Sequence, residues 1–182
     1  MIGAEGAKAI AKALKVNAVL TELWLWNNNI GPEGAIAIAE VLKVNAVLTD
    51  LRLDWNNIGA EGAIAIAEAL KVNAGLTYLR LDNNKIGAEG AKAIAEALKV
   101  NAVLTSLDVG HTEQAVLDNA KLSLIDNNIG QEGAIAIAEA LKVNTVLTKL
   151  WLGSFFVNNL GDAGKTAVQD AVKGRSGFQL HL

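Results

Sequence analysis

The chain has 182 residues, a formal net charge of −3 and no cysteine, and its acidic and basic residues are interspersed along its length. Such a balance leaves no electrostatic footprint for nucleic acid or for an anionic membrane, so neither partner is expected. The lack of cysteine excludes a disulfide framework, and the N-terminus lacks the basic and apolar regions of a signal peptide. No uninterrupted apolar stretch approaches the roughly 20 residues that a membrane span needs. These features favour a soluble, cytoplasmic protein.

The first expected element is a helix with no strand before it. The segment Ile2-Gly3-Ala4-Glu5-Gly6 aligns with Ile30-Gly31-Pro32-Glu33-Gly34, so residues 1–19 are interpreted as a leading half repeat. Ile10 and Leu14 are expected to cover the first strand while the outer side of this helix stays open to water. Such an open end predicts self-association, a longer parent array or an engineered start.

From Leu20 onward, one stretch of sequence recurs. Copies start at Leu20, Leu48, Leu76 and Leu104 at a constant 28-residue step, and another starts at Leu147 after a longer interval. A fixed period of this length indicates a solenoid, in which one supersecondary unit is stacked many times. Residues 20–160 are therefore expected to form repeats within a single elongated domain that spans 1–182.

Two hydrophobic periods follow each other inside one repeat. Leu51 and Leu53 alternate with polar residues, which predicts a short strand with one buried face. The period then changes to that of a helix, expected over roughly 60–71. The apolar stripe of this helix consists of Ala63, Ile66, Ala67 and Leu70. Each repeat is thus predicted to run strand, turn, helix and return.

Asparagines stand at both ends of the predicted helix. Asn56 and Asn57 lie between strand and helix, where side-chain amides bond the backbone of the turn, and their recurrence predicts a ladder from coil to coil. Glu61 falls in the first helical turn and Lys71 in the last, as the helix dipole favours. Asn73 follows the helix and is suited to a left-handed terminating conformation.

The recurring motif resembles a known family. Leu20-x-x-Leu23-x-Leu25-x-x-Asn28-x-Ile30-Gly31 and its copies at Leu48 and Leu76 resemble the leucine-rich repeat. The period with a full helix resembles the ribonuclease-inhibitor subfamily, which also occurs in the sensor domains of intracellular immune receptors. The resemblance implies a right-handed α/β solenoid shaped as a horseshoe, with about five repeats. It places a parallel sheet on the concave face and helices on the convex face, and implies protein binding without catalysis. Because this chain has no cysteine, the activity of the inhibitor itself is not implied.

Two insertions interrupt the period. Ile86 and Ile129 stand 43 residues apart, 15 more than one period, and the extra length lies in or near 110–124. Three further residues enter near 153–157. Tolerated drift in a surface loop, or a degenerate, compressed repeat, is favoured over a functional loop for these insertions. The strand of the interrupted repeat is either Leu107-Asp108-Val109 or Leu122-Ser123-Leu124, and both fit.

Residues 161–182 are predicted to form a C-terminal cap. Lys165 and Gln169 occupy positions where Ala35 and Ala39 stand in the first full repeat, and polar groups on the outer side of a last helix are typical of a cap. A final short strand is expected where Phe178, Leu180 and Leu182 alternate.

The strand positions that point outward vary between copies, and we expect the ligand there. All four tryptophans and the single tyrosine of the chain fall on or beside this concave surface. Trp, Tyr and Arg are the residue types that dominate binding hot spots, so this surface is predicted to recognise a protein or peptide. The candidate contacts are Trp24, Trp26, Arg52, Asp54, Trp55, Tyr78, Arg80, Asp82, Lys149 and Trp151.

The charged candidates allow another interpretation. These side chains can form ion pairs with one another across neighbouring strands instead of binding a ligand, and the sequence favours neither interpretation. The residues concerned are Arg52, Asp54, Arg80 and Asp82. For Trp24 and Trp26 a ligand-binding role is favoured, because two exposed tryptophans on one strand are an energetically costly cover for a polar face.

Catalysis finds little support in the sequence. His111 and His181 are far apart and have no cysteine or carboxylate cluster at metal-ligand spacing, so no metal is expected. Asp54 and Asp82 form a carboxylate pair, but an open sheet offers no enclosed pocket to shift their pKa values. We therefore expect a non-enzymatic binding scaffold without cofactor. The alternative is a structural, consensus-like or engineered repeat protein with no natural ligand.

Overall fold

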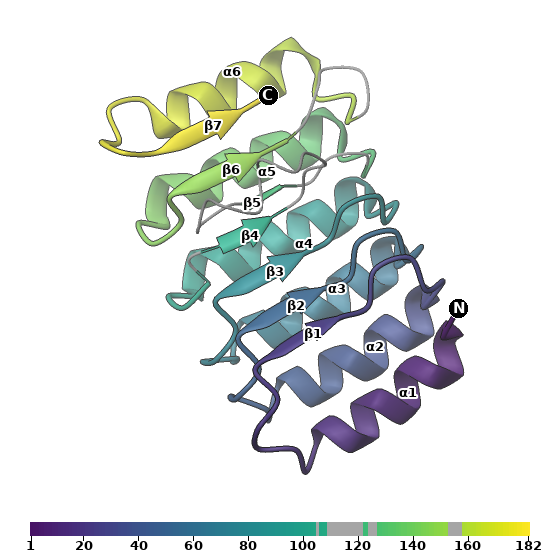
Figure 1. Ribbon diagram of the computed structural model, residues 1–182. Helices are drawn as coiled ribbons and strands as arrows, with labels where there is room; N and C mark the ends of the chain where they lie inside the picture. Colours follow the sequence, from purple (N-terminus) through teal and green to yellow (C-terminus); the bar gives the residue numbers. More distant parts are fainter. Residues whose placement is uncertain (105, 109–121, 124–126, 153–157) are drawn as a thin grey trace.

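The computed structural model describes residues 1–104, 106–108, 122–123, 127–152 and 158–182 (Figure 1). For 106–108, 122–123 and Trp151 only the backbone is described. The insertion near 110–124 and the one near 153–157 therefore lie almost wholly outside the described residues.

Helices and short strands alternate along the described chain and form two layers, strands on one side and helices on the other (Figure 1). All the strand pairs are parallel, in a four-stranded sheet of order β1-β2-β3-β4 and a three-stranded sheet of order β5-β6-β7. The protein is thus an α/β fold with short parallel strands. The elements are α1 (Gly3–Leu14), β1 (Glu22–Trp24), α2 (Gly31–Leu42), β2 (Asp50–Arg52), α3 (Gly59–Leu70), β3 (Tyr78–Arg80), α4 (Gly87–Val100), β4 (Ser106–Asp108), β5 (Leu122–Ser123), α5 (Gly130–Val143), β6 (Lys149–Trp151), α6 (Gly161–Val172) and β7 (Gln179–His181).

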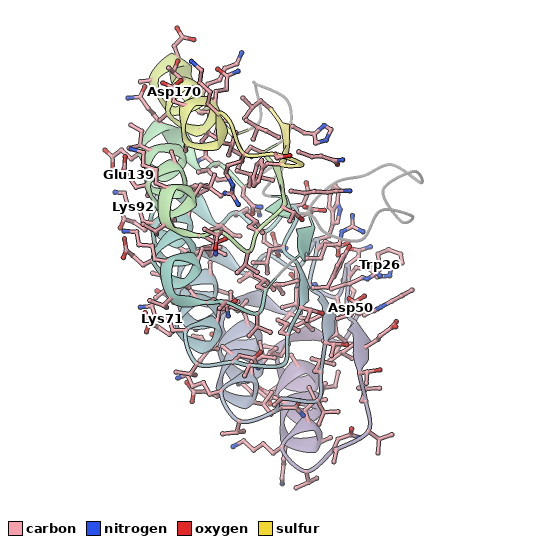
Figure 2. The ribbon with its side chains drawn as sticks, turned by 90° about the vertical axis from the view of Figure 1, so that its left-hand side faces the viewer. Trp26, Asp50, Lys71, Lys92, Glu139 and Asp170 are labelled. Atoms are coloured by element: carbon pink, nitrogen blue, oxygen red, sulfur yellow. The ribbon has the colours of Figure 1, made fainter. Side chains whose placement is uncertain are left out.

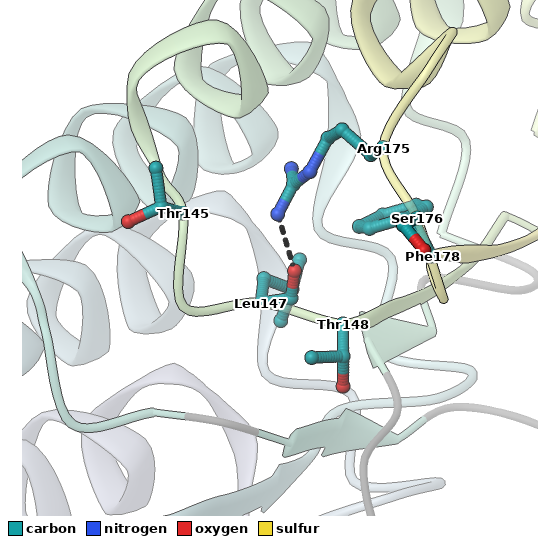
Figure 3. Close-up of a pocket in the computed structure, with 6 residues that line it drawn as sticks. All are labelled: Thr145, Leu147, Thr148, Arg175, Ser176 and Phe178. Carbon is teal, nitrogen blue, oxygen red and sulfur yellow. Dashed lines mark hydrogen bonds between the residues drawn. The ribbon is translucent and has the colours of Figure 1, made fainter.

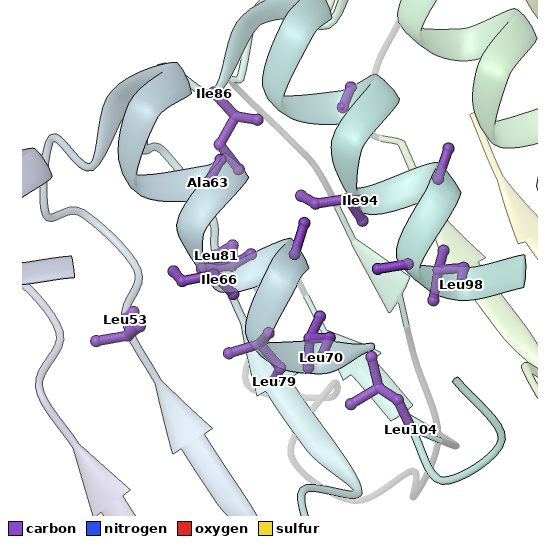
Figure 4. Close-up of a cluster of buried hydrophobic side chains, with 14 of the residues drawn as sticks. Leu53, Ala63, Ile66, Leu70, Leu79, Leu81, Ile86, Ile94, Leu98 and Leu104 are labelled. Atoms are coloured by element: carbon purple, nitrogen blue, oxygen red, sulfur yellow. The ribbon is translucent and has the colours of Figure 1, made fainter. Parts of the chain in front are cut away.

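The core lies between the two layers and continues from coil to coil. Leu51 pairs in register with Leu23 and Leu79, so each coil adds a leucine to the same column. The predicted helical stripe is confirmed, because all four of its residues in α3 are fully buried. Figure 4 shows Ile66 and Leu70 of α3 in one cluster with Ile94 and Leu98 of α4 and with Leu79 and Leu81 of the strand layer. Burial of each leucine contributes about 1.5–3 kcal/mol, so the stack is held together mainly by this column and stripe.

A glycine in the first turn of each helix from α2 to α6 lets it approach the preceding helix. A Cβ atom at Gly62 would lie 2.8 Å from Cβ of Ala35 on the preceding helix and would also contact Ile58. Gly90 faces Ala63 at 2.9 Å in the same way. Any side chain there would push the helices apart, since real Cβ atoms do not approach so closely.

The predicted asparagine ladder between strand and helix is confirmed. Asn56 Oδ1 accepts a hydrogen bond of 2.9 Å from the backbone N–H of Asn28, and its amide donates to the carbonyl of Leu25 in the preceding coil at 2.8 Å. Asn84 repeats the arrangement one coil later by accepting from Asn56 N–H at 2.9 Å. The fully buried asparagines thereby satisfy backbone groups that would otherwise be stranded inside the stack.

A second ladder runs along the opposite edge, and it corrects the expected role of Asn73. This residue is not among those with positive φ in the described chain, so it does not end its helix in a left-handed conformation. Its amide donates instead to the carbonyl of Leu42 at 2.6 Å, and its Oδ1 accepts from the N–H of Leu76 at 2.7 Å. Side-chain bonds to the last carbonyl of the preceding helix thus replace the left-handed cap.

The coils stay in register across both insertions. Asn84 N–H donates to Asn127 Oδ1 over 43 residues, and Asn127 N–H donates to Asn158 Oδ1 over 31. The ladder asparagines that flank each insertion are therefore direct neighbours. Both candidate strands of the interrupted repeat exist: Ser106–Asp108 is the last strand of the first sheet, and Leu122–Ser123 is the first strand of the second.

Candidate functional site: the strand face

We call the outer surface of the strands, opposite the helices, the strand face. Figure 2 places Trp26 and Asp50 on this side and the charged residues Lys71 and Lys92 on the helix side. Strand side chains alternate, so the leucine at the centre of β2 or β3 is buried while both of its neighbours are partly exposed. The described side chains of the strand face are Glu22, Trp24, Trp26, Asp50, Arg52, Asp54, Trp55, Tyr78, Arg80, Asp82 and Lys149.

Three tryptophans of the first two coils remain open to solvent. Trp24 is 54% exposed, Trp26 is 57% exposed and Trp55 is 47% exposed. Large aromatic surfaces with few rotamers are the usual anchors of protein interfaces. The structure therefore leaves an aromatic patch on β1 and at the turns after β1 and β2.

Arg52 links this patch to the next two strands. Its guanidinium carbon lies 4.1 Å from the centroid of the Trp24 ring and 5.1 Å from that of Tyr78. Asp50 holds this guanidinium in place by accepting hydrogen bonds of 3.2 Å from Nε and 2.9 Å from Nη2 of Arg52. Burial acts to lower the pKa of Arg52, but the hydrogen bond and charge of Asp50 outweigh it, and the pKa lies above its ordinary value.

Arg80 lies directly beside Arg52 in the register, and its charge is neutralised by two carboxylates. It donates to Asp82 Oδ2 at 3.1 Å from Nη2, and its Nε lies 3.6 Å from Asp54 Oδ1 in the preceding coil. Asp54 and Asp82 were expected to be outward-facing ligand contacts, yet they are only 6% and 2% exposed. Their side chains lie against Arg80, and this diagonal contact offsets the repulsion between like charges on adjacent strands. Arg80, Asp54 and Asp82 thus satisfy one another across neighbouring strands, whereas Arg52 pairs with Asp50 of its own strand.

Trp55 has a backbone conformation that is unusual for an aromatic residue. Its φ is +58°, and the equivalent positions of the neighbouring coils are Asn27 with φ +55° and Asn83 with φ +55°. Asparagine tolerates this left-handed region, whereas a bulky side chain pays a steric penalty there. Strained residues of this kind concentrate at functional sites.

The remaining predicted contacts lie farther along the stack. Lys149 is partly exposed on β6, and it pairs in register with Gln179 of β7. Trp151 pairs with His181, but its side chain lies outside the described residues. The structure therefore gathers Trp24, Arg52 and Tyr78 on adjacent strands and places Lys149 and Trp151 in the second sheet.

One interacting residue at the far end was not singled out in the sequence. Arg175 lies between α6 and β7, with its guanidinium carbon 4.5 Å from the centroid of the Phe178 ring. A signal was present, because the segment after α6 reads Lys-Gly-Arg-Ser-Gly where the other coils have Lys-Val-Asn followed by Ala or Thr.

Within the described ranges there is no group of three or more His, Cys, Asp or Glu side chains placed to hold a metal ion. Over the same residues, no helix combines the length and apolarity needed to cross a membrane.

Stacked coils of strand, turn and helix, tied by asparagine ladders, define this chain as a leucine-rich repeat protein. Two family models match it: the TMOD/LMOD Leucine-rich domain over residues 1–128 and a Leucine Rich repeat over residues 121–138. The chain belongs to the TMOD/LMOD leucine-rich domain family.

Solved structures of similar shape agree with this assignment. The structure titled "Leiomodin-1 Actin-Binding Site 2 (ABS2)" has a TM-score of 0.68 at 26% sequence identity, covering 91% of this chain and 85% of that chain. The tropomodulin C-terminal domain of Caenorhabditis elegans has a TM-score of 0.67 at 14% identity, covering 91% of this chain and 90% of its own, and it shows the fold alone. No curated protein sequence matches the chain significantly.

Proposed function

We propose that the chain is a non-enzymatic scaffold that binds a protein or peptide through the strand face, as the concave face of a horseshoe-shaped solenoid. The observation that carries this proposal is the aromatic patch of Trp24, Trp26 and Trp55, which is about half exposed and adjoins a rigidly held Arg52. Aromatic and arginine side chains at the centre of an interface supply most of its binding energy.

Actin is the partner that we propose to test first. The leiomodin-1 structure is titled as an actin-binding site, and its likeness to this chain extends over 91% of the residues. The strand face supports a protein partner of this kind because Trp24 and Trp26 offer apolar area while Glu22 and Arg52 offer charge at its rim.

The test is co-sedimentation with actin filaments, together with a binding titration against monomeric actin. The double variant Trp24→Ala and Trp26→Ala is expected to weaken binding at least about tenfold, as removal of hot-spot residues does. The matched control removes exposed apolar area from the helix side with Ile36→Ala and Ile64→Ala, at residues that are 37% and 40% exposed. Equal losses in both double variants would refute the strand face as the site, and no binding of either actin form would refute actin as the partner.

Self-association is a second candidate, favoured by the exposure of one end of the stack. Leu20 is 39% exposed and Val19 is 82% exposed, whereas Leu48, at the position of Leu20 one coil later, is fully buried. β1 is the outer strand of its sheet, so its free edge and these side chains form a surface that a second copy can cover. Sedimentation equilibrium over a hundredfold concentration range tests this, and a constant monomer mass would exclude it.

Three further details belong to the same proposal. A ribonuclease-inhibitor-like repeat of 28 residues is supported by the pairing of Glu22 with Asp50 and of Asp50 with Tyr78. A cap at 161–182 of a single domain is supported by the exposure of Gln169 where Ala39 is buried. A cytoplasmic location is supported by the lack of cysteine.

A further inference from the structure

The loop between α6 and β7 holds one arginine in a defined place. Gly174, with φ +83°, and Gly177, with φ +77°, enclose Arg175 and Ser176 in a tight turn. The guanidinium of Arg175 donates from Nη2 to the carbonyl of Leu147 at 2.6 Å and from Nη1 to that of Leu141 at 3.3 Å. The head group is therefore fixed between the last two coils.

In the earlier coils a neutral side chain, not a charged one, donates to the equivalent helix carbonyl. Leu141 lies in the last turn of α5 as Leu98 lies in the last turn of α4, and the carbonyl of Leu98 accepts from the neutral amide of Asn144 at 2.7 Å. The carbonyl of Leu70 accepts from Asn101 at 2.6 Å in the same way. Since a neutral amide is sufficient in those coils, the positive charge of Arg175 exceeds what the fold requires.

This charge has no counter-ion among the described residues. Every ion pair of the described chain uses another basic residue, and Arg175 donates only to carbonyls. Burial lowers the pKa of Arg175, because the desolvated cation gains no carboxylate in return. The guanidinium also carries more N–H donors than the two carbonyls occupy.

An open pocket of about 260 Å³ adjoins the guanidinium (Figure 3). Figure 3 shows Arg175 entering from the α6–β7 loop, with Thr145 and Leu147 from the preceding coil on the opposite side. Hydroxyl-bearing residues supply half of the lining, and hydroxyl groups donate hydrogen bonds to oxyanions. The lining residues are Thr145, Leu147, Thr148, Arg175, Ser176 and Phe178.

We propose that this pocket binds an oxyanion, a carboxylate or a phosphate group, with Arg175 as the charged ligand and neighbouring hydroxyl groups as further donors. Arginine presents paired donors that match such groups, and a cation already desolvated by the protein binds an anion more strongly than one in free solvent. The site lies away from the aromatic patch, at the edge formed by the helix C-termini, so it is independent of the proposed strand-face function.

The experiment follows backbone amide signals of the full chain by NMR during titration with inorganic phosphate or acetate, with chloride holding the ionic strength constant. We expect saturable shifts confined to residues 145–148 and 174–178. Arg175→Gln keeps an amide donor but removes the charge, and it is expected to weaken the anion about tenfold or more. Lys12→Gln makes the same change of net charge on α1, at the other end of the stack, and should leave the affinity unchanged.

A second variant, Thr148→Val, tests the same site if Arg175→Gln does not fold. Thr148→Val keeps the shape of an exposed side chain and removes its hydroxyl group, and it is expected to weaken binding about threefold. Tighter binding of phosphate than of acetate would identify a phosphate site, and the reverse would identify a carboxylate site. The absence of saturable shifts with both anions would overturn the proposal, as would unchanged binding in a folded Arg175→Gln variant.

Discussion

The guanidinium of Arg52 stacks on the ring of Trp24, with its central carbon 4.1 Å from the ring centroid. The two residues come from neighbouring coils and are in register as strand partners. A cation over an exposed indole contributes about 0.5–1 kcal/mol, and Asp50 holds the cation in place from its own strand. The ring of Trp24 is thus held by Arg52, which reduces the conformational entropy that a ligand has to overcome there.

The strained backbone at Trp55 predicts a difference between two tryptophan variants. Trp55→Asn and Trp26→Asn remove side chains that are 47% and 57% exposed, so the loss of buried area is similar. Only Trp55 has a positive φ, +58°, which asparagine adopts with little strain. Trp55→Asn is therefore expected to be the more stable variant by about 1 kcal/mol in urea denaturation. Equal midpoints and slopes for the two variants would show that the backbone of Trp55 stores no strain.

Removal of one ladder asparagine predicts a large loss of stability. Asn56→Ala removes the Oδ1 that accepts from the N–H groups of Asn28 and Ile30, and it removes one of the two amide donors to the carbonyl of Leu25. Stranding such buried groups is expected to cost about 2–4 kcal/mol of unfolding free energy. Asn57→Gly is the control, because Asn57 is exposed, bonds only the side chain of Asn29, and has a positive φ that glycine tolerates. Chemical denaturation of both variants checks the difference, and similar midpoints would argue against the ladder.

The helix glycines predict a steric effect that depends on a neighbouring helix. Gly62→Ala places a Cβ atom 2.8 Å from that of Ala35, whereas a Cβ atom at Gly6 would meet only the side chain of Ile2. Both substitutions gain helix propensity, so their difference isolates the packing. Gly62→Ala is expected to be less stable than Gly6→Ala by about 1–3 kcal/mol in thermal unfolding. A Gly62→Ala protein as stable as Gly6→Ala would show that the helices can separate freely.

A salt bridge on the helix side predicts a pH effect. Lys92 donates to Glu132 on the next helix at 2.6 Å, and this bond followed by the Lys92 charge holds the pKa of Glu132 below its ordinary value. A carboxyl whose pKa is lowered by folding stabilises the protein above its unfolded pKa, and this contribution disappears as the pH falls through the folded pKa. Lys92→Ile places the residue that α2, α3 and α5 carry at this position and is expected to raise the pKa of Glu132. An NMR titration of the Glu132 carboxyl in both proteins measures the shift, with Lys71→Ile, directly after α3, as the control that should leave it unchanged.

The periodic parts of the structure were predictable from the sequence. The spacing of Leu51 and Leu53 predicted the strand, the stripe ending at Leu70 predicted α3 within one residue at each end, and Asn56 predicted the ladder. These features follow from local periodicity, because each coil buries the same face against an identical neighbour. The parallel order of the strands then follows from stacking, and the family match over residues 1–128 agrees with it.

The partners of the strand-face charges and of Asn73 were decided only by the tertiary structure. Burial of Asp54 and Asp82 depends on where the guanidinium of Arg80 lies, and a one-dimensional pattern of outward positions does not contain that distance. The role of Asn73 depends on the carbonyl that the preceding helix offers, which displaced the expected left-handed cap. The pocket beside Arg175 depends on stacking too, because its lining combines Thr145, Leu147 and Thr148 with residues of the loop after α6. The repeated sequence therefore determined the scaffold, whereas the long polar side chains acquired their partners only when the coils were stacked, because those partners lie one coil away in space.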